Sequence, residues 1–336
     1  MYIRATGNIS PQNSFGHQPL PDVPVSYTGN RMNCIEPDYK GLIDVKLIRR
    51  MSRIIKMGVA AAVECLQEAG VTVPDAIITG TAYGCLEDTG NFITKMVEHN
   101  EELLTPTAFI QSTHNTIGGQ IGLLLQCNNY NNAYVHRGFS FESALLDGMM
   151  LLKEKEAATV LVGAIDEITN ISHTIISRMG LYRNGTVAGE GAAFFLLADQ
   201  PSATHYAKLD GLTTFYKPTD QKEIEQNINS FLSMQGSTIA DIDLIITGRN
   251  GDQQHDEIYN ALDTAIFNGV NTVNYKQLCG EYPTSTGFAL WLAANIIKTG
   301  TIPAFLESKS NGTVKKILIY NNYLGIHHSL MLVSAC

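Results

Sequence analysis

Few side chains in this sequence form a pattern that could do chemistry without help from distant residues. Six cysteines are present, but none forms a CxxC pair and no histidine stands at metal-ligand spacing from them. Ser140 opens a stretch with helical periodicity, where a serine is either a nucleophile beside a base or, more often, a helix cap. The run His255-Asp256-Glu257 has the residue types of metal ligands, although such runs more often begin helices. No serine lies in a nucleophile-elbow pattern, and a Ser-His-Asp triad assembled only by the fold stays open.

Helix-like and strand-like stretches alternate along the chain and would position these side chains. Apolar spacings of three and four predict a helix over 47–69, which Gly70 would end. Further helices are expected over 140–155, 222–234, 256–267 and 286–298. Strands are expected over 2–6, 76–79, 158–163, 192–197, 244–247, 272–275, 316–320 and 329–333, and loops over 11–40 and 127–132. This alternation predicts an α/β fold in which helices cover a mixed sheet.

An internal repeat indicates a duplicated architecture. Residues 75–80 read Asp-Ala-Ile-Ile-Thr-Gly and residues 243–248 read Asp-Leu-Ile-Ile-Thr-Gly, an offset of 243 − 75 = 168 in a chain of 336 residues. Each copy follows a helical segment and precedes a loop that leads to another helix. We therefore expect two similar halves, residues 1–200 and 201–336, within one compact unit.

Composition and charge exclude several functional classes. Hydrophobic residues make up 44% and charged residues 16%, as in ordinary globular proteins. The net charge is −9 and no more than two Lys or Arg residues are adjacent, which argues against nucleic acid and against a broad basic dock for an acidic carrier protein. No apolar run is long enough to span a membrane, and the first residues lack a signal-peptide pattern. We expect a cytoplasmic protein that needs neither a metal nor another cofactor.

Five segments, in this order, resemble the β-ketoacyl synthase family: residues 6–11, 105–115, 161–167, 185–192 and 276–287. The third reads Leu-Val-Gly-Ala-Ile-Asp-Glu and the fourth Gly-Thr-Val-Ala-Gly-Glu-Gly-Ala, which is similar to the family's "aGgaE" and "GeGAg" motifs. No single segment is specific, but their order is. The resemblance implies a thiolase-like fold, with two duplicated βαβαβ-type halves in an αβαβα layered arrangement.

The same resemblance implies that all three catalytic side chains of the family are replaced. The nucleophilic cysteine, at the start of the helix over 140–155, corresponds to Gly138, which has no side chain to acylate. The two histidines correspond to Thr247 and Glu281, and the family's lysine to Lys276. An ionised Glu281 about 4 Å from a developing enolate would oppose it by about 4 kcal/mol at an effective dielectric of 20, roughly a thousandfold in rate.

Other residues of the pocket are expected to fill it. Of the glycine series in the family's C-terminal loop, only Gly325 remains, and its bulkier neighbours are expected to occlude the site. We hypothesise that His136 or Arg137 pairs with Glu281. The alternative is that Glu281 meets Lys276 or water.

Three functional readings follow from the resemblance. The first is a chain-length-factor-type subunit, non-catalytic, that forms a heterodimer with an active ketosynthase in polyene, polyketide or fatty-acid biosynthesis and meets the acyl carrier protein indirectly. Strand 132–135 and the segment Thr105–Asn115 would face the partner, and Phe109 would reach toward its acyl tunnel. The second is an acyltransferase or hydrolase with rebuilt chemistry at Ser140, His136 or Glu281. The third is a stand-alone acyl-binding homodimer.

Overall fold

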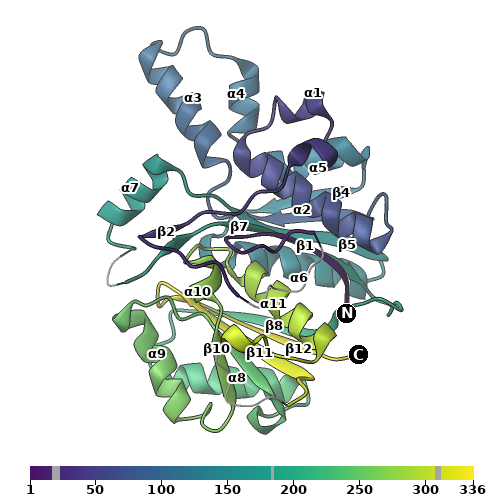
Figure 1. Ribbon diagram of the computed structural model, residues 1–336, viewed down its shortest axis with the longest axis vertical. Coiled ribbons are helices and arrows are strands. Elements are labelled where there is room, and N and C mark those ends of the chain that lie inside the picture. The colour runs from purple at the N-terminus through teal and green to yellow at the C-terminus, as the bar shows by residue number, and fades with distance from the viewer. Residues whose placement is uncertain (17–22, 183–184, 307–311) are drawn as a thin grey trace.

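A single mixed sheet organises the molecule. The computed structural model describes residues 1–16, 23–182, 185–306 and 312–336. Within them the sheet has ten strands in the order β10-β9-β11-β12-β8-β1-β7-β5-β3-β4 (Figure 1). The strands are β1 (Tyr2–Ile9), β3 (Ala76–Gly80), β4 (Tyr130–Tyr134), β5 (Thr159–Asp166), β7 (Gly191–Ala198), β8 (Ala207–Tyr216), β9 (Leu244–Thr247), β10 (Asn271–Asn274), β11 (Lys316–Tyr323) and β12 (His327–Ser334). A separate two-stranded sheet pairs β2 (Arg31–Met32) with β6 (Ala188–Gly189).

The two halves of this sheet repeat the same pairing pattern. From β1, strand β7 is antiparallel, β5 is antiparallel to β7, and β3 and β4 follow in parallel. From β8, strand β12 is antiparallel, β11 is antiparallel to β12, and β9 and β10 follow in parallel. The halves join through a short antiparallel contact between β1 and β8.

The sequence repeat has the same structural role in both halves. Asp75 and Asp243 stand just before β3 and β9, and each carboxylate accepts hydrogen bonds from two consecutive backbone N–H groups at the start of the neighbouring parallel strand. These groups belong to residues 158–159 and 315–316, at distances of 2.8 to 2.9 Å. The aspartate therefore fixes the register of strands β5 and β11, and the predicted duplication is confirmed.

Helices and sheet form five layers around three apolar cores. The helices are α2 (Arg53–Ala69), α5 (Thr116–Leu125), α6 (Ser140–Lys153), α8 (Gln221–Met234), α9 (Gln253–Thr264) and α11 (Thr286–Thr299). One core packs α2 and α5 on the outer face of the first half-sheet, and another packs α8 and α9 on the outer face of the second. The largest packs α6 and α11 between the two half-sheets, as Figure 1 shows. This is the αβαβα arrangement that the family resemblance implies.

A helical hairpin departs from this compact body. Helices α3 (Leu86–Glu98) and α4 (Pro106–Gln111) contain no fully buried residue, and they project above α2 in Figure 1. The short helix α7 (Asn170–Arg178) lies nearby and exposes Ile171 and Ile175. Among the described residues, no helix combines the length and apolarity needed to cross a membrane.

Several predicted elements are corrected by the structure. The helix expected over 47–69 is two helices, α1 (Val45–Ile48) and α2, because Ser52 adopts an extended backbone at the start of α2. Gly70 ends α2 in the left-handed region, with φ of 64°, as expected. The prediction of a loop over 127–132 is wrong from Tyr130 onward, because β4 begins there. In the loop expected over 11–40, residues 17–22 lie outside the described residues, and the short strand β2 interrupts the remainder.

Candidate functional site

The start of α6 is the position that the resemblance gives to the family nucleophile. Gly138 lies there in a buried 3-10 turn, η2 (Arg137–Phe139). A Cβ atom at Gly138 would stand 2.7 Å from Tyr323 Cδ1 and 3.1 Å from His327 Cβ. Both separations are shorter than ordinary van der Waals contact, so the space that a cysteine side chain would need is occupied. The expected occlusion of the pocket therefore has a specific cause.

The tyrosine that fills this space comes from a tight hairpin. Strand β11 continues to Tyr323 and strand β12 begins at His327, so only three residues separate the strands. Leu324 and Gly325 both have positive φ, at 59° and 68°, and Ile326 N–H donates to Tyr323 O at 3.3 Å. Gly325 is thus a turn residue here, and the segment that resembles the family's C-terminal loop is a hairpin instead. The hairpin presents Tyr323 and His327 to Gly138.

Ser140 is held in the backbone of the same turn. Its hydroxyl donates to Arg137 O at 2.8 Å and accepts from His136 N–H at 2.8 Å. The His136 ring lies instead beside Ser143, with Nδ1 3.3 Å from the Ser143 hydroxyl. A serine whose proton is donated to a carbonyl, with no base beside it, lacks the activation that a nucleophile requires.

A buried ion pair lies at the position that the resemblance gives to the second family histidine. Lys276 Nζ donates to Glu281 Oε2 at 2.8 Å, and both side chains are almost completely buried. Asn250 Nδ2 donates to the same oxygen at 2.7 Å. The hypothesis that Arg137 or His136 pairs with Glu281 is not supported, because both are exposed while Glu281 faces Lys276. The alternative partner, Lys276, is the one observed.

Thr247 also has its hydrogen-bonding capacity engaged. It ends β9 in a buried position, and its hydroxyl donates to Val273 O at 3.1 Å. The donor that could have replaced an imidazole is therefore already used within the sheet. Together, Gly138, Thr247 and Glu281 offer no thiol at the first position and no free side-chain donor to a developing oxyanion.

Two family-like segments have structural explanations that are independent of catalysis. At Gly189 a Cβ would lie 1.9 Å from Cys279 O, because the backbone of β6 crosses that of residues 279–280. Glu190 is fully buried and pairs with Arg53 through both carboxylate oxygens, at 2.7 and 2.5 Å. It also accepts from the N–H groups of Cys34 and Ile168, each at 2.9 Å. These contacts tie the 185–192 segment to α2.

Sequence reasoning missed a buried carboxyl group close to the site. Glu142, in the first turn of α6, is 1% exposed, and burial raises its pKa to about 7. The hydroxyls of Thr286 and Ser329 and the charge of Lys276 lower that pKa in part. Within the described residues, neither Glu142 oxygen has a well-formed hydrogen bond. Its sequence context resembles the polar side of an ordinary helix, so no pattern distinguished it.

Two further acids lie at the end of β5. Asp166 accepts from the hydroxyls and backbone of the 81–82 and 284 segments, yet burial raises its pKa to about 6. Glu167 accepts from Glu87 N–H at 3.0 Å, and burial raises its pKa to about 7. Asp166 therefore joins the loop after β3 to the start of α11, which positions the walls of the site.

The segment expected to face a partner is exposed. Phe109 in α4 has an exposed fraction of 57%, and its ring packs against Phe92 of α3 at a centroid distance of 5.7 Å. Asn115 is exposed at the start of α5 and accepts from the Thr113 hydroxyl at 2.9 Å. Among the described residues of this chain, neither Phe109 nor Asn115 contacts Gly138.

Comparison with known proteins identifies the family to which the chain belongs. Residues 36–213 match the family model described as the N-terminal domain of β-ketoacyl synthase. The chain belongs to the β-ketoacyl synthase family. No curated protein matches it.

Solved structures of similar shape span the whole chain. "The ishigamide ketosynthase/chain length factor" aligns at a TM-score of 0.81 and 16% identity, covering 100% of this chain and 98% of that one. A β-ketoacyl synthase from Burkholderia phymatum STM815 aligns at 0.80 and 13%, covering 100% and 99%. The ketosynthase ApeO in complex with its chain length factor ApeC, from Xenorhabdus doucetiae, aligns at 0.77 and 14%, covering 100% and 98%. At these identities the likeness shows the thiolase-like ketosynthase fold.

Proposed function

We propose that this chain is a non-catalytic subunit of the chain-length-factor type that assembles with an active β-ketoacyl synthase. The pathway class would be polyene, polyketide or fatty-acid biosynthesis, with the acyl carrier protein held mainly by the active subunit. Similar structures include a complex of a ketosynthase with its chain length factor, which supports this choice of partner.

The observation that carries the proposal is the occupied space at Gly138. A family member that merely lost its cysteine would keep an open pocket, whereas here Tyr323 and His327 fill it. The buried Lys276–Glu281 pair supports the same conclusion, because a carboxylate there would oppose an enolate. Several independent replacements in one pocket favour a protein whose contribution is not bond formation.

A surface suited to a partner lies at the free edge of the sheet. Strand β4 is the last strand in the sheet order, and unpaired strand edges readily pair with another chain. Tyr130 at the start of β4 and Val135 just after it expose 45% each, and Leu146 and Met150 of the adjacent α6 expose 48% and 49%. This surface, which we call the β4–α6 face, is continuous in sequence with the turn at Gly138. We propose it as the contact with the active subunit.

Co-purification with the intact ketosynthases of the source organism tests this assignment. Met150→Glu should abolish capture, because it places a charge in the apolar β4–α6 face. Met234→Glu is the matched control, since Met234 is exposed on α8 at the other end of the molecule and should leave capture unchanged. Equal capture by both variants would refute the assigned face, and no capture by the native chain would refute the partner proposal.

The readings with rebuilt chemistry or a stand-alone homodimer gain no support from the site. The Ser140 hydroxyl is bonded within its own turn, and Glu281 is paired with Lys276. Turnover of an acyl thioester by the isolated chain, lost in Ser140→Ala or Glu281→Ala, would establish the first of them. A stable homodimer that ignores every ketosynthase would establish the second.

A further inference from the structure

Three basic side chains gather beside the turn at Gly138, in a chain whose net charge is −9. His136 and Arg137 are exposed where the chain leaves β4, and Lys217 is exposed directly after β8. Burial and then the charges of these three groups lower the pKa of His327, so all three lie within electrostatic reach of its ring. We call His136, Arg137 and Lys217 the basic cluster.

Aromatic rings connect the members of the basic cluster. The His327 ring packs against those of Phe139 and Tyr216, at centroid distances of 4.8 and 5.1 Å. The His136 ring lies 5.9 Å from that of Phe139, and Lys217 Nζ lies 5.2 Å from the centroid of the Tyr216 ring. Tyr216 has an exposed fraction of 54%. The basic groups therefore border one partly exposed aromatic surface instead of standing as isolated surface charges.

The basic cluster has no counter-charge among the described residues. None of its three side chains forms an ion pair with a described carboxylate. The buried His327 Nδ1 also has no hydrogen-bond partner in that part of the chain. The positive end of the α6 macrodipole lies at the same turn and adds to the local charge. An anionic group is therefore the complement that this surface lacks.

Two members of the basic cluster have an unusual backbone conformation. Arg137 and Lys217 both have positive φ, at 50° and 49°. L-residues rarely adopt this conformation, and it persists where the surroundings fix it, commonly at functional sites. Lys217 N–H donates to Ile326 O at 2.8 Å, and Arg137 O accepts from the Ser140 hydroxyl at 2.8 Å. The hairpin and the turn thus hold both residues in place.

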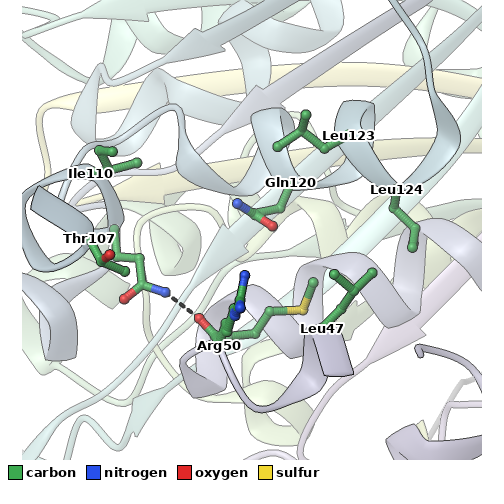
Figure 2. A pocket seen from close by; sticks show the side chains of 9 residues that line it. Leu47, Arg50, Thr107, Ile110, Gln120, Leu123 and Leu124 are labelled. Atoms are coloured by element: carbon green, nitrogen blue, oxygen red, sulfur yellow. Dashed lines mark hydrogen bonds between the residues drawn. The ribbon is translucent and has the colours of Figure 1, made fainter. Parts of the chain in front are cut away.

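The basic cluster adjoins the β4–α6 face. Val135 belongs to that face, exposes 45% of its surface and directly precedes His136. The pocket in Figure 2 is formed by α4, α5 and the segment that joins α1 to α2, and it shares no lining residue with the cluster. A protein that covers the β4–α6 face would therefore meet the cluster at the end of β4.

We propose that the basic cluster pairs with carboxylate side chains of the active ketosynthase, beside the edge of β4. The proposal rests on the proposed function, because it takes the β4–α6 face as the contact. Complementary charges at an interface set partner choice and the rate of association more than they set affinity. A ketosynthase without acidic residues at this position would leave the cations desolvated and unpaired, which selects against it. The partner of this chain is therefore an intact ketosynthase that presents carboxylates there.

Affinity measurements by biolayer interferometry test the proposal, with the ketosynthase that this chain captures as the immobilised partner. The double variant Arg137→Gln with Lys217→Gln should weaken binding by about tenfold or more, the lower end of the coupling between close interfacial charges. Lys315→Gln is the matched control and should leave the affinity unchanged. Lys315 is exposed and precedes β11, at the opposite end of that strand from the hairpin. Unfolding midpoints of the variants confirm that each is folded.

Salt dependence provides a readout that a merely structural role of these residues would not move. The native chain should bind less tightly as NaCl rises from about 0.1 to about 1 M, because the Debye length then falls from about 10 to about 3 Å. The double variant should show little of this dependence, because the charges that salt screens are absent.

The outcomes separate this proposal from the partner assignment. Equal affinity of the native chain and the double variant, while Met150→Glu still abolishes capture, would overturn the charge pairing and leave the partner assignment standing. Capture of no ketosynthase by the native chain would overturn both. Binding of the carrier protein alone to the native chain, lost in the double variant, would also overturn the proposal, because the cluster would then serve the carrier protein.

Discussion

Adding one methyl group at Gly138 should measurably destabilise the protein. In Gly138→Ala the new Cβ would stand 2.7 Å from Tyr323 Cδ1 and 3.0 Å from Tyr323 Cβ. Tyr323 is buried and begins a tight hairpin, so its ring cannot rotate away freely. Overpacking of this kind costs about 1–3 kcal/mol. For a chain of 336 residues this corresponds to a fall in the unfolding midpoint of about 1–4 °C.

Thermal unfolding of four proteins would measure this effect. The cost of Gly138→Ala should be smaller in a Tyr323→Ala background, because the ring atom at 2.7 Å is then absent while the Cβ atoms of residues 323 and 327, at 3.0 and 3.1 Å, remain. Gly119→Ala is the matched control, since Gly119 lies inside α5 and a Cβ there would meet no atom within 4 Å. That substitution should be neutral or stabilising, because alanine is the better helix former.

An equal effect of Gly138→Ala in both backgrounds would refute the reasoning. It would mean that Tyr323 does not fill the space beside Gly138, and the occluded site would lose its structural basis. Neutral behaviour in the native background would have the same meaning, because the contacts described leave no room for the added atom.

Three further predictions concern buried polar groups. Burial raises the pKa of Glu142 to about 7, above its ordinary 4.5, so the folded protein loses stability as the pH rises from about 4.5 to 7. The variant Glu142→Gln should remove this loss. In urea unfolding it should be more stable than the native protein by about 3 kcal/mol at pH 8, but not at pH 4.5. Lys276→Met should destabilise the protein by about 3–5 kcal/mol, because it leaves the buried Glu281 carboxylate without its partner. The double variant Lys276→Met with Glu281→Leu should recover most of that loss. Additive losses of the two substitutions would contradict the buried pair. Burial lowers the pKa of His328 to about 4, so stability should fall as the pH drops from 6.5 to 4, and His328→Phe should flatten this dependence in the same assay.

Elements with strong local patterns were predictable from the sequence. Strand β9 occupies the expected residues 244–247, and α8 and α11 differ from their expected bounds by a single residue at one end. These segments bury regular apolar positions, so local periodicity and tertiary packing agree. The resemblance of five short segments gave the family because their order carries information that no single segment has.

Strands with weak local patterns were not predictable from those patterns, and only the family resemblance gave a strand over 132–135. Strand β4 contains Asn131 and Asn132, which disfavour strands, and it forms because β3 offers a parallel edge. Strand β8 carries Lys208, Asp210 and Gly211 within its length and is stabilised by pairing with the distant β12. In both cases a neighbour far along the chain decides the structure.

The contacts of the candidate site were not predictable from the sequence. The resemblance gives Gly138, Thr247 and Glu281 as replacements of the family's catalytic residues, and it left the partner of Glu281 open among His136, Arg137, Lys276 and water. The choice of Lys276 depends on a turn in which Gly280 has φ of 75°. The occlusion by Tyr323 depends on a hairpin whose register brings it to a residue 185 positions away, since 323 − 138 = 185.

The most direct test of the partner proposal is chain elongation by an intact ketosynthase, purified with and without this chain, on malonyl-loaded carrier protein. The account predicts that elongation, or the length of the product, depends on this chain, and that Ser140→Ala and Glu281→Gln leave that dependence intact. Elongation that is identical without this chain, or that is lost in a correctly folded and assembled Ser140→Ala protein, would contradict it.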